Sequence, residues 1–209
     1  WVTPEWEYPD AEVLDFANLL VPTMDSTRAL FLLDHLQARK KPVLMVGGPG
    51  TAKTSTALMY FEQFAENMML KKVNFSSATT MEMFQLTITG ELDKRGGKTF
   101  GPPGGKKMTV FLDDLGMPEV NNWKDQPTLE IVRQLIENGN IAFLEKDRRG
   151  DLQTIEDLQF VGATSHPGGG KNDIPSRLKR QFFMFNMITP STTSIDNIYG
   201  QMLDGRIDM

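Results

Sequence analysis

The sequence contains no cysteine. Disulfide bonds and thiolate metal sites are therefore excluded, and nothing in the composition indicates secretion, so we expect a cytosolic compartment. No apolar run approaches the roughly 20 residues that a membrane-spanning helix needs. The segment that starts at Trp1 also lacks the basic and apolar regions of a signal peptide. We expect no membrane partner.

An excess of positive charge is also missing. The net charge is −5 and the isoelectric point is near 5.1. Such a chain has no overall positive field to attract nucleic acid or an anionic lipid surface, although a local basic patch is compatible with it. We expect no nucleic-acid partner.

What is present is the composition of an ordinary globular domain. Of the 209 residues, 40% are hydrophobic and 23% are charged, which suffices for one full core. The chain opens without Met and stops at Met209 just after a helix-like stretch. We interpret it as part of something longer.

Apolar segments of strand length alternate with helical patterns along the chain. A first helix is expected to start with Asp25 or Ser26 as its N-cap, and a second to run from Lys53 to about Met69. Strands that alternate with helices predict an α/β fold with a parallel sheet covered on both faces. The predicted strands are 42–46, 72–76, 108–113, 158–164 and 182–188, with further helices around 81–92, 128–137 and 175–180.

Two stretches interrupt this alternation. Residues 96–107 are rich in Gly, Pro and Lys, and residues 141–156 have the pattern of a hairpin. We interpret both as short insertions on the α/β core. Counting the core strands along the chain, we expect a five-stranded parallel sheet of order 5-1-4-3-2, which brings Lys53 and Asp113 together at its carboxyl edge.

A glycine-rich loop follows the first predicted strand. It matches the P-loop pattern except that Ala52 replaces the last glycine, a change that is sterically cheap if the φ of Ala52 is negative. In a P-loop the backbone N–H groups surround the phosphates, Lys53 supplies charge to the β and γ groups, and Thr54 offers a hydroxyl to Mg²⁺. The alternative, a plain turn, is disfavoured by the strand-loop-helix context. The predicted nucleotide-binding residues are Gly48, Pro49, Gly50, Thr51, Ala52, Lys53, Thr54 and Ser55.

The apolar run 109–112 ends in two carboxylates, Asp113 and Asp114, about 60 residues after the P-loop. This spacing is typical of a Walker B strand. Asp113 is predicted to hold Mg²⁺ and Asp114 to act as the general base for the attacking water. Glu is common at the second position, and because Asp is one methylene shorter, slow hydrolysis is expected. The alternative is a pair of solvated carboxylates.

Polar residues also follow the next strand, at Ser165 and His166. Proteins of this kind place a side chain there, usually Asn, that orients the attacking water. Ser165 or His166 would take that role, and an ordinary strand-to-loop turn is an equally good interpretation.

The segment 175–180 has the form of a short basic helix. Arg180 is predicted to project as a finger toward the nucleotide of a neighbouring module, with Arg177 as the second choice. A solvated basic helix is the alternative. At the other end of the chain, Leu20, Val21 and Pro22 precede the first helix and are predicted to wall the adenine, unless they form a surface loop.

With these motifs placed, the sequence resembles the dynein heavy chains, and their third AAA+ module in particular. The likeness extends from about Leu20 to Gly200 and is much more specific than a P-loop alone. The His-Pro-Gly-Gly-Gly run and the form of the phosphate loop are similar to outer-arm axonemal chains of the gamma type. The residues that carry the resemblance are 20–28, 74–80, 92–95, 100–107, 111–118, 130–134 and 166–175.

The resemblance implies an AAA+ large α/β subdomain over residues 20–190. Residues 1–19 would form an N-terminal linker segment, and 191–209 the truncated start of the small lid subdomain. It also implies a ring of modules within one long polypeptide, in which the first module drives movement along microtubules and the third binds ATP or ADP with Mg²⁺ and gates that movement.

The implied partners are the neighbouring AAA+ modules and, through the parent motor, the microtubule and the dynein intermediate and light chains. The implied location is the cytoskeleton of the cytoplasm and the axoneme of cilia or flagella. The leading hypothesis is therefore an ATP-binding, slowly hydrolysing regulatory module. One alternative is a non-hydrolysing nucleotide switch, which Asp114 and the missing Asn favour. Another is a different AAA+ machine, such as a clamp loader or a remodelling ring.

Overall fold

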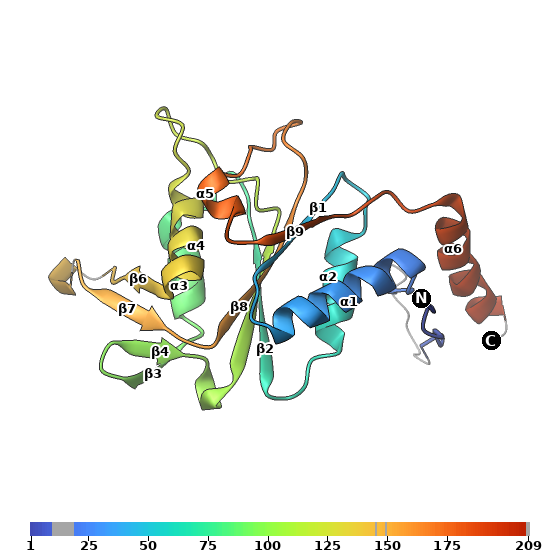
Figure 1. The fold of residues 1–209 in the computed structure, drawn as a ribbon, viewed down its shortest axis with the longest axis horizontal. Coiled ribbons are helices and arrows are strands. Elements are labelled where there is room, and N and C mark those ends of the chain that lie inside the picture. The colour runs from blue at the N-terminus through green and yellow to red at the C-terminus, as the bar shows by residue number, and fades with distance from the viewer. Residues whose placement is uncertain (10–18, 145, 149, 208–209) are drawn as a thin grey trace.

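A computed structural model describes residues 1–9, 19–144, 146–148 and 150–207 (Figure 1). Its centre is a five-stranded parallel sheet of order β2-β5-β8-β1-β9. Counted along the chain, this is the predicted order 5-1-4-3-2, which is confirmed. The strands are β1 (Val43–Val46), β2 (Met68–Asn74), β5 (Lys107–Asp113), β8 (Leu158–Thr164) and β9 (Phe183–Asn186).

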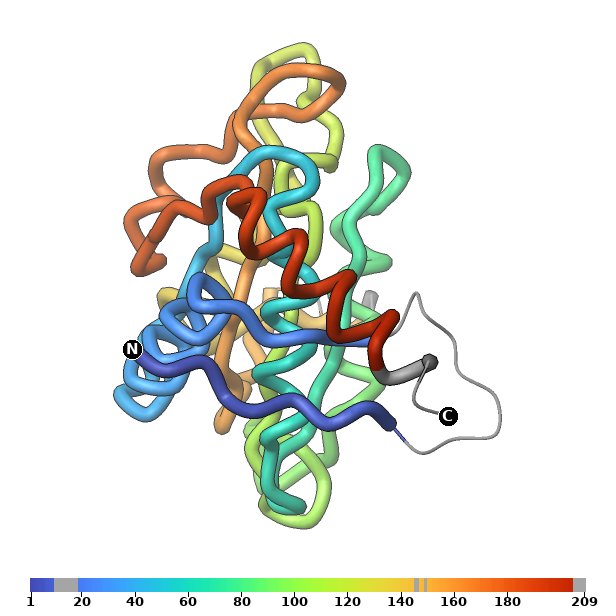
Figure 2. The backbone as a smooth tube through the Cα atoms, turned by 90° about the vertical axis from the view of Figure 1, so that its right-hand side faces the viewer, coloured from blue at the N-terminus to red at the C-terminus, as the bar shows by residue number. Residues whose placement is uncertain are grey.

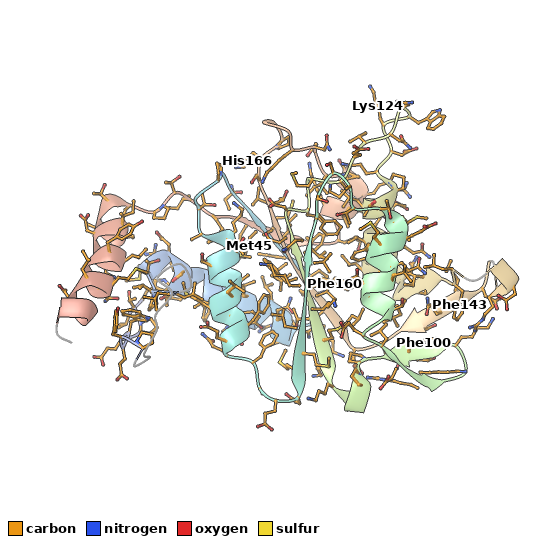
Figure 3. The ribbon with its side chains drawn as sticks, turned by 180° about the vertical axis from the view of Figure 1, so that it is seen from behind. Met45, Phe100, Lys124, Phe143, Phe160 and His166 are labelled. Carbon is orange, nitrogen blue, oxygen red and sulfur yellow. The ribbon has the colours of Figure 1, made fainter. Side chains whose placement is uncertain are left out.

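Helices cover both faces of this sheet, as predicted (Figure 1). Because side chains alternate along a strand, Val43 and Met45 of β1 pack with Leu33 and Phe61 on one face, whereas Leu44 packs on the other. Figure 3 shows Met45 and Phe160 near the middle of the sheet, and they belong to the two different core clusters. The helices are α1 (Met24–Ala38) and α2 (Lys53–Glu62) on the first face, and α3 (Met81–Thr89), α4 (Pro127–Asn138) and the short α5 (Ser176–Lys179) on the second.

Two predicted helix boundaries are wrong. The N-cap of α1 is Thr23, because its hydroxyl accepts from the Ser26 N–H at 3.2 Å while the Ser26 hydroxyl accepts from the Thr23 N–H at 2.8 Å. Helix α2 ends at Glu62 and does not reach Met69, since Met68 already pairs with Lys107 as the first residue of β2.

The two predicted insertions join in a second sheet. Strands β3 (Asp93–Gly96), β4 (Thr99–Gly101), β6 (Asn140–Ala142) and β7 (Leu152–Ile155) form it in the order β3-β4-β7-β6. Phe100 and Phe143, one from each insertion, meet with ring centroids 6.1 Å apart (Figure 3). We call this the accessory sheet. Two 3₁₀ turns, η2 (Pro103–Gly105) and η3 (Lys146–Arg148), flank it.

The last element is α6 (Thr192–Ile207), which stands outside the layers around the parallel sheet (Figures 1 and 2). The predicted start of a lid subdomain at residue 191 falls at this helix and stays a prediction. Of the predicted linker segment 1–19, residues 10–18 lie outside the described residues. Within the described part of the chain, no helix is both long and apolar enough to cross a membrane.

Candidate nucleotide-binding site

The phosphate loop joins β1 to α2 at the carboxyl edge of the parallel sheet (Figure 1). Its first glycine is packed tightly, because a Cβ at Gly47 would lie 2.5 Å from the Met187 carbonyl oxygen and 2.7 Å from Thr51 Oγ1. The Gly47 N–H also donates to the Thr164 carbonyl of β8 at 3.1 Å. The start of the loop is therefore held by β8 on one side and packed against the residue that follows β9 on the other.

Ala52 has a φ of 56°, in the left-handed region. The condition under which its methyl group would be cheap, a negative φ, is not met. A non-glycine residue in this conformation costs about 1–2 kcal/mol, so the substitution of the usual glycine carries backbone strain. The strained residue is the N-cap of α2, directly before Lys53.

Lys53 folds back over its own loop. Its ammonium donates to the carbonyls of Gly47 at 2.9 Å and Gly48 at 2.7 Å, and to Thr51 Oγ1 at 3.1 Å. Burial lowers the pKa of Lys53, and the nearby Lys171 ammonium lowers it further, against the opposing effect of Asp114 and Asp113. An ammonium held by neutral oxygens next to a second cation is a suitable partner for phosphate oxygens.

Asp113 ends β5 opposite the start of α2. The Thr54 hydroxyl donates to its two carboxylate oxygens at 3.1 and 3.3 Å, and the Lys72 ammonium lies 3.7 Å from Oδ2. The Asp113 side chain is only 14% exposed. A hydroxyl and a carboxylate are hard oxygen donors, and Mg²⁺ in phosphate sites binds one or two such protein groups together with phosphates and water. The donor set therefore fits Mg²⁺, and the described residues contain no cluster of three or more His, Cys, Asp or Glu for another kind of metal site.

Asp114 has a φ of 54°, in the left-handed region. Its carboxylate is half exposed and accepts from the Lys171 ammonium at 2.7 Å, and the same ammonium donates to Ser165 Oγ at 3.0 Å. The two adjacent carboxylates thus have different partners. The structure brings Asp114 and Ser165 together through Lys171, a residue that we did not single out from the sequence.

Lys171 lies at the end of a glycine-rich loop, residues 165–172, that follows β8. Gly168 and Lys171 form an isolated β-bridge, and Gly168, Gly169 and Gly170 have φ values of 121°, 58° and 85°. Such angles are accessible to glycine at little cost. The signal in the sequence was a lysine directly after three glycines, at the end of a strand next to the P-loop strand.

The remaining predicted residues lie around this centre. His166 is exposed above the sheet (Figure 3), so of the two candidates for orienting water only Ser165 lies next to the Asp114–Lys171 pair. Val21 is buried, and Leu20 and Pro22 are half-buried. A cavity beside the phosphate loop is lined by residues of the α1 N-terminus, the loop and the segment after β9, among them Thr23, Ala29, Thr51, Thr56, Met187 and Ile188.

The two candidate finger arginines are exposed on or next to α5. Arg180 pairs with Glu137 of α4 at 3.1 Å, and Arg177 lies 3.7 Å from Glu130. Both side chains are more than 60% exposed, so both can be reached from outside this chain. Each stays a prediction.

Comparisons with known proteins agree with this architecture. Residues 8–190 match the family described as the P-loop containing dynein motor region. The chain is 49% identical over 205 residues to the dynein gamma chain of the flagellar outer arm of Chlamydomonas reinhardtii, and 50% identical over 199 residues to axonemal dynein heavy chain 5 of Mus musculus. These alignments cover 97% and 95% of this chain but only 4% of each relative. Axonemal dynein heavy chain 10 of Homo sapiens is 36% identical over 201 residues, which is 95% of this chain and 4% of that protein.

Proposed function

The chain belongs to the dynein family of P-loop motor regions, and from this we propose that it binds ATP with Mg²⁺ and hydrolyses the ATP slowly, as a regulatory module of an axonemal dynein heavy chain. The observation that carries the proposal is the meeting of Lys53, Thr54 and Asp113 at one edge of the sheet, with Asp114 directly beside them. A glycine-rich turn without a ligand would not need a buried carboxylate facing its threonine.

The chemistry follows from the contacts. Oxygens of the β- and γ-phosphates replace the Gly47 and Gly48 carbonyls as acceptors for Lys53, and backbone N–H groups of the loop donate to the other phosphate oxygens. Thr54 and Asp113 would hold Mg²⁺, which when bound would neutralise phosphate charge. Attack by water forms a bond to the γ-phosphorus and breaks the bond to the β-phosphate oxygen, while Asp114 receives the proton that the water loses.

We propose slow hydrolysis because both the length of the Asp114 side chain and its contact with Lys171 make it a poor general base. Its side chain is one methylene shorter than Glu, and its carboxylate is engaged by Lys171 at 2.7 Å, so that contact must break before Asp114 can receive a proton. A displacement of about 1 Å of a reacting group can cost on the order of 10²-fold in rate. The same contact favours a second candidate, a nucleotide switch that binds ATP without hydrolysing it.

The wider setting comes from the relatives, two of which are named as axonemal heavy chains and one as a flagellar outer-arm chain. We propose that the chain serves as the third module of such a motor in the cytoskeleton of cilia or flagella. There it would contact neighbouring AAA+ modules and act, through the parent motor, together with the microtubule and the intermediate and light chains. Arg180, or Arg177 beside it, would reach the nucleotide of a neighbouring module.

Single-turnover hydrolysis separates the two candidates. In the complete heavy chain with its other nucleotide sites disabled, we expect one phosphate to be released slowly per site, and Asp114→Asn to slow that release by about 10²-fold or more while nucleotide binding persists. Bound ATP that stays intact in the unsubstituted chain would instead identify a non-hydrolysing switch.

A further inference from the structure

Lys171 is a cation of the site to which the proposed function gives no contact with the nucleotide. Its ammonium lies between two groups at the carboxyl edge of the sheet, 2.7 Å from Asp114 Oδ1 and 3.0 Å from Ser165 Oγ. Its side chain is 27% exposed, so it is partly withdrawn from water and yet open to a ligand.

The position of Lys171 is built by the backbone. The Asn172 N–H donates to the Gly116 carbonyl at 2.8 Å, and the Asn172 side-chain amide donates to the Pro118 carbonyl at 2.9 Å. Together with the Gly168–Lys171 bridge, these bonds fix the backbone of the lysine itself and of the residue that follows it. The loop therefore holds the Lys171 ammonium within the site, so that this long side chain does not extend into solvent.

The charges around the site are arranged for an anion. The three ammonium groups are those of Lys53, Lys72 and Lys171, and the two carboxylates are Asp113 and Asp114. Lys72 and Lys171 each face one carboxylate, whereas Lys53 faces carbonyl and hydroxyl oxygens. An anion bound at this edge of the sheet would face the ammonium groups of both Lys53 and Lys171.

We propose that Lys171 binds the terminal phosphate of a nucleoside triphosphate and so lets the site distinguish triphosphate from diphosphate, an inference that rests on the proposed function. Without nucleotide the ammonium is held by Asp114. When a triphosphate binds, the ammonium transfers to γ-phosphate oxygens by rotation of its flexible side chain. The transfer releases the Asp114 carboxylate, so the base becomes free only when a γ-phosphate is present.

The test compares two ligands on the complete heavy chain with its other nucleotide sites disabled. Two isothermal titrations in the presence of Mg²⁺, one with a non-hydrolysable imido analogue of ATP and one with ADP, give one dissociation constant for each ligand. For Lys171→Met we expect the triphosphate analogue to bind about tenfold more weakly, because one charge-assisted contact is lost, with ADP unchanged within about twofold. Lys171→Arg should keep the preference, and Lys171→Gln serves in place of Lys171→Met if that variant does not fold.

A matched control comes from the accessory sheet. Lys98 pairs with Asp151 at 2.8 Å, as Lys171 does with Asp114, but it lies away from the phosphate loop. Lys98→Met should change neither dissociation constant. Asp114→Asn should raise the affinity for the triphosphate analogue several-fold and leave the affinity for ADP unchanged. The reason is that no carboxylate then competes with the phosphate for the Lys171 ammonium. In the double variant Lys171→Met with Asp114→Asn that gain should vanish.

The outcomes separate this inference from the proposed function. If the unsubstituted site of the complete heavy chain binds neither ligand, the proposed function fails. If it binds both and Lys171→Met weakens them equally, or weakens neither, the role of Lys171 is overturned while the proposed function stands. If Asp114→Asn leaves the triphosphate affinity unchanged, the competition between Asp114 and the phosphate is refuted.

Discussion

Two glycine-rich loops leave the carboxyl ends of adjacent strands, and each presents a lysine to the same site. Residues 47–54 follow β1 and residues 165–172 follow β8, and these strands pair in parallel. Figure 2 shows both loops on the same side of the molecule. Lys53 donates to carbonyls of its own loop. Lys171 instead donates to the carboxylate of Asp114, which follows β5 and lies outside both loops.

The loops use glycine for different reasons. Gly47 is required by space, because the Met187 carbonyl and Thr51 lie against it. Gly168, Gly169 and Gly170 have nothing within 4 Å of an added Cβ, and their positive φ values are what favours glycine. Packing thus constrains the first loop at Gly47, whereas Gly50 of that loop, with a φ of 73°, resembles the three glycines of the second loop in being favoured by its backbone conformation. We expect the first loop to be the more sensitive to an added methyl group.

Among the variants that test the comparison between the two loops, Lys53→Ala is expected to have the largest effect. Removing the phosphate-facing ammonium should abolish nucleotide binding, whereas the Lys171 variants only change the preference between ligands. Nucleotide titration followed by thermal unfolding checks this. An unchanged ATP affinity would refute the P-loop role of Lys53.

The fold itself should tolerate that substitution. The pKa of Lys53 is lowered in the folded state, chiefly by burial, so folding disfavours its charged form. Between the folded pKa and 10.5 the unfolded chain binds more protons, and stability should therefore rise with pH in that window. Urea unfolding of the nucleotide-free chain should show a smaller rise for Lys53→Ala than for the unsubstituted chain.

An intermediate effect is expected for Gly47→Ala. The added Cβ would lie 2.5 Å from a backbone oxygen, and overpacking of this kind costs about 1–3 kcal/mol. Gly48→Ala is the matched control, since nothing lies within 4 Å of its added Cβ. Chemical denaturation measures both variants. Equal losses of stability at the two positions would show that packing does not shape this loop.

Much of the first loop's surroundings could be predicted from the sequence. The P-loop pattern and the acidic end of β5 are local, and together they require a strand order that brings Lys53 and Asp113 to one edge. The pair of Asp114 and Lys171 could not be predicted in this way, because 57 residues separate the partners and no local pattern relates them. The accessory sheet was missed for the same reason, since its β4–β7 contact joins two separate insertions.

Backbone angles could not be predicted from the sequence either. A capping box at Thr23 and Ser26 decides where α1 starts, and either Asp25 or Ser26 looked a suitable cap in the sequence. At Ala52 the pattern gave the residue type but not its positive φ. That angle depends on how the loop is held between Gly47 and α2.

The smallest effect, and the last test of how the first loop is shaped, is expected for Ala52→Gly. The φ of Ala52 is 56°, and its side chain is exposed, so a glycine would relieve backbone strain without removing any core packing. The gain should be about 1 kcal/mol, less the extra conformational entropy that glycine has in the unfolded chain. Ala38→Gly, at the exposed end of α1, should change stability in the opposite direction by about 0.5–1 kcal/mol. Urea denaturation of the two variants measures whether each substitution raises or lowers the free energy of unfolding. If Ala52→Gly destabilises the chain as Ala38→Gly does, the loop does not hold Ala52 in a strained conformation, and Lys53 is positioned without that cost.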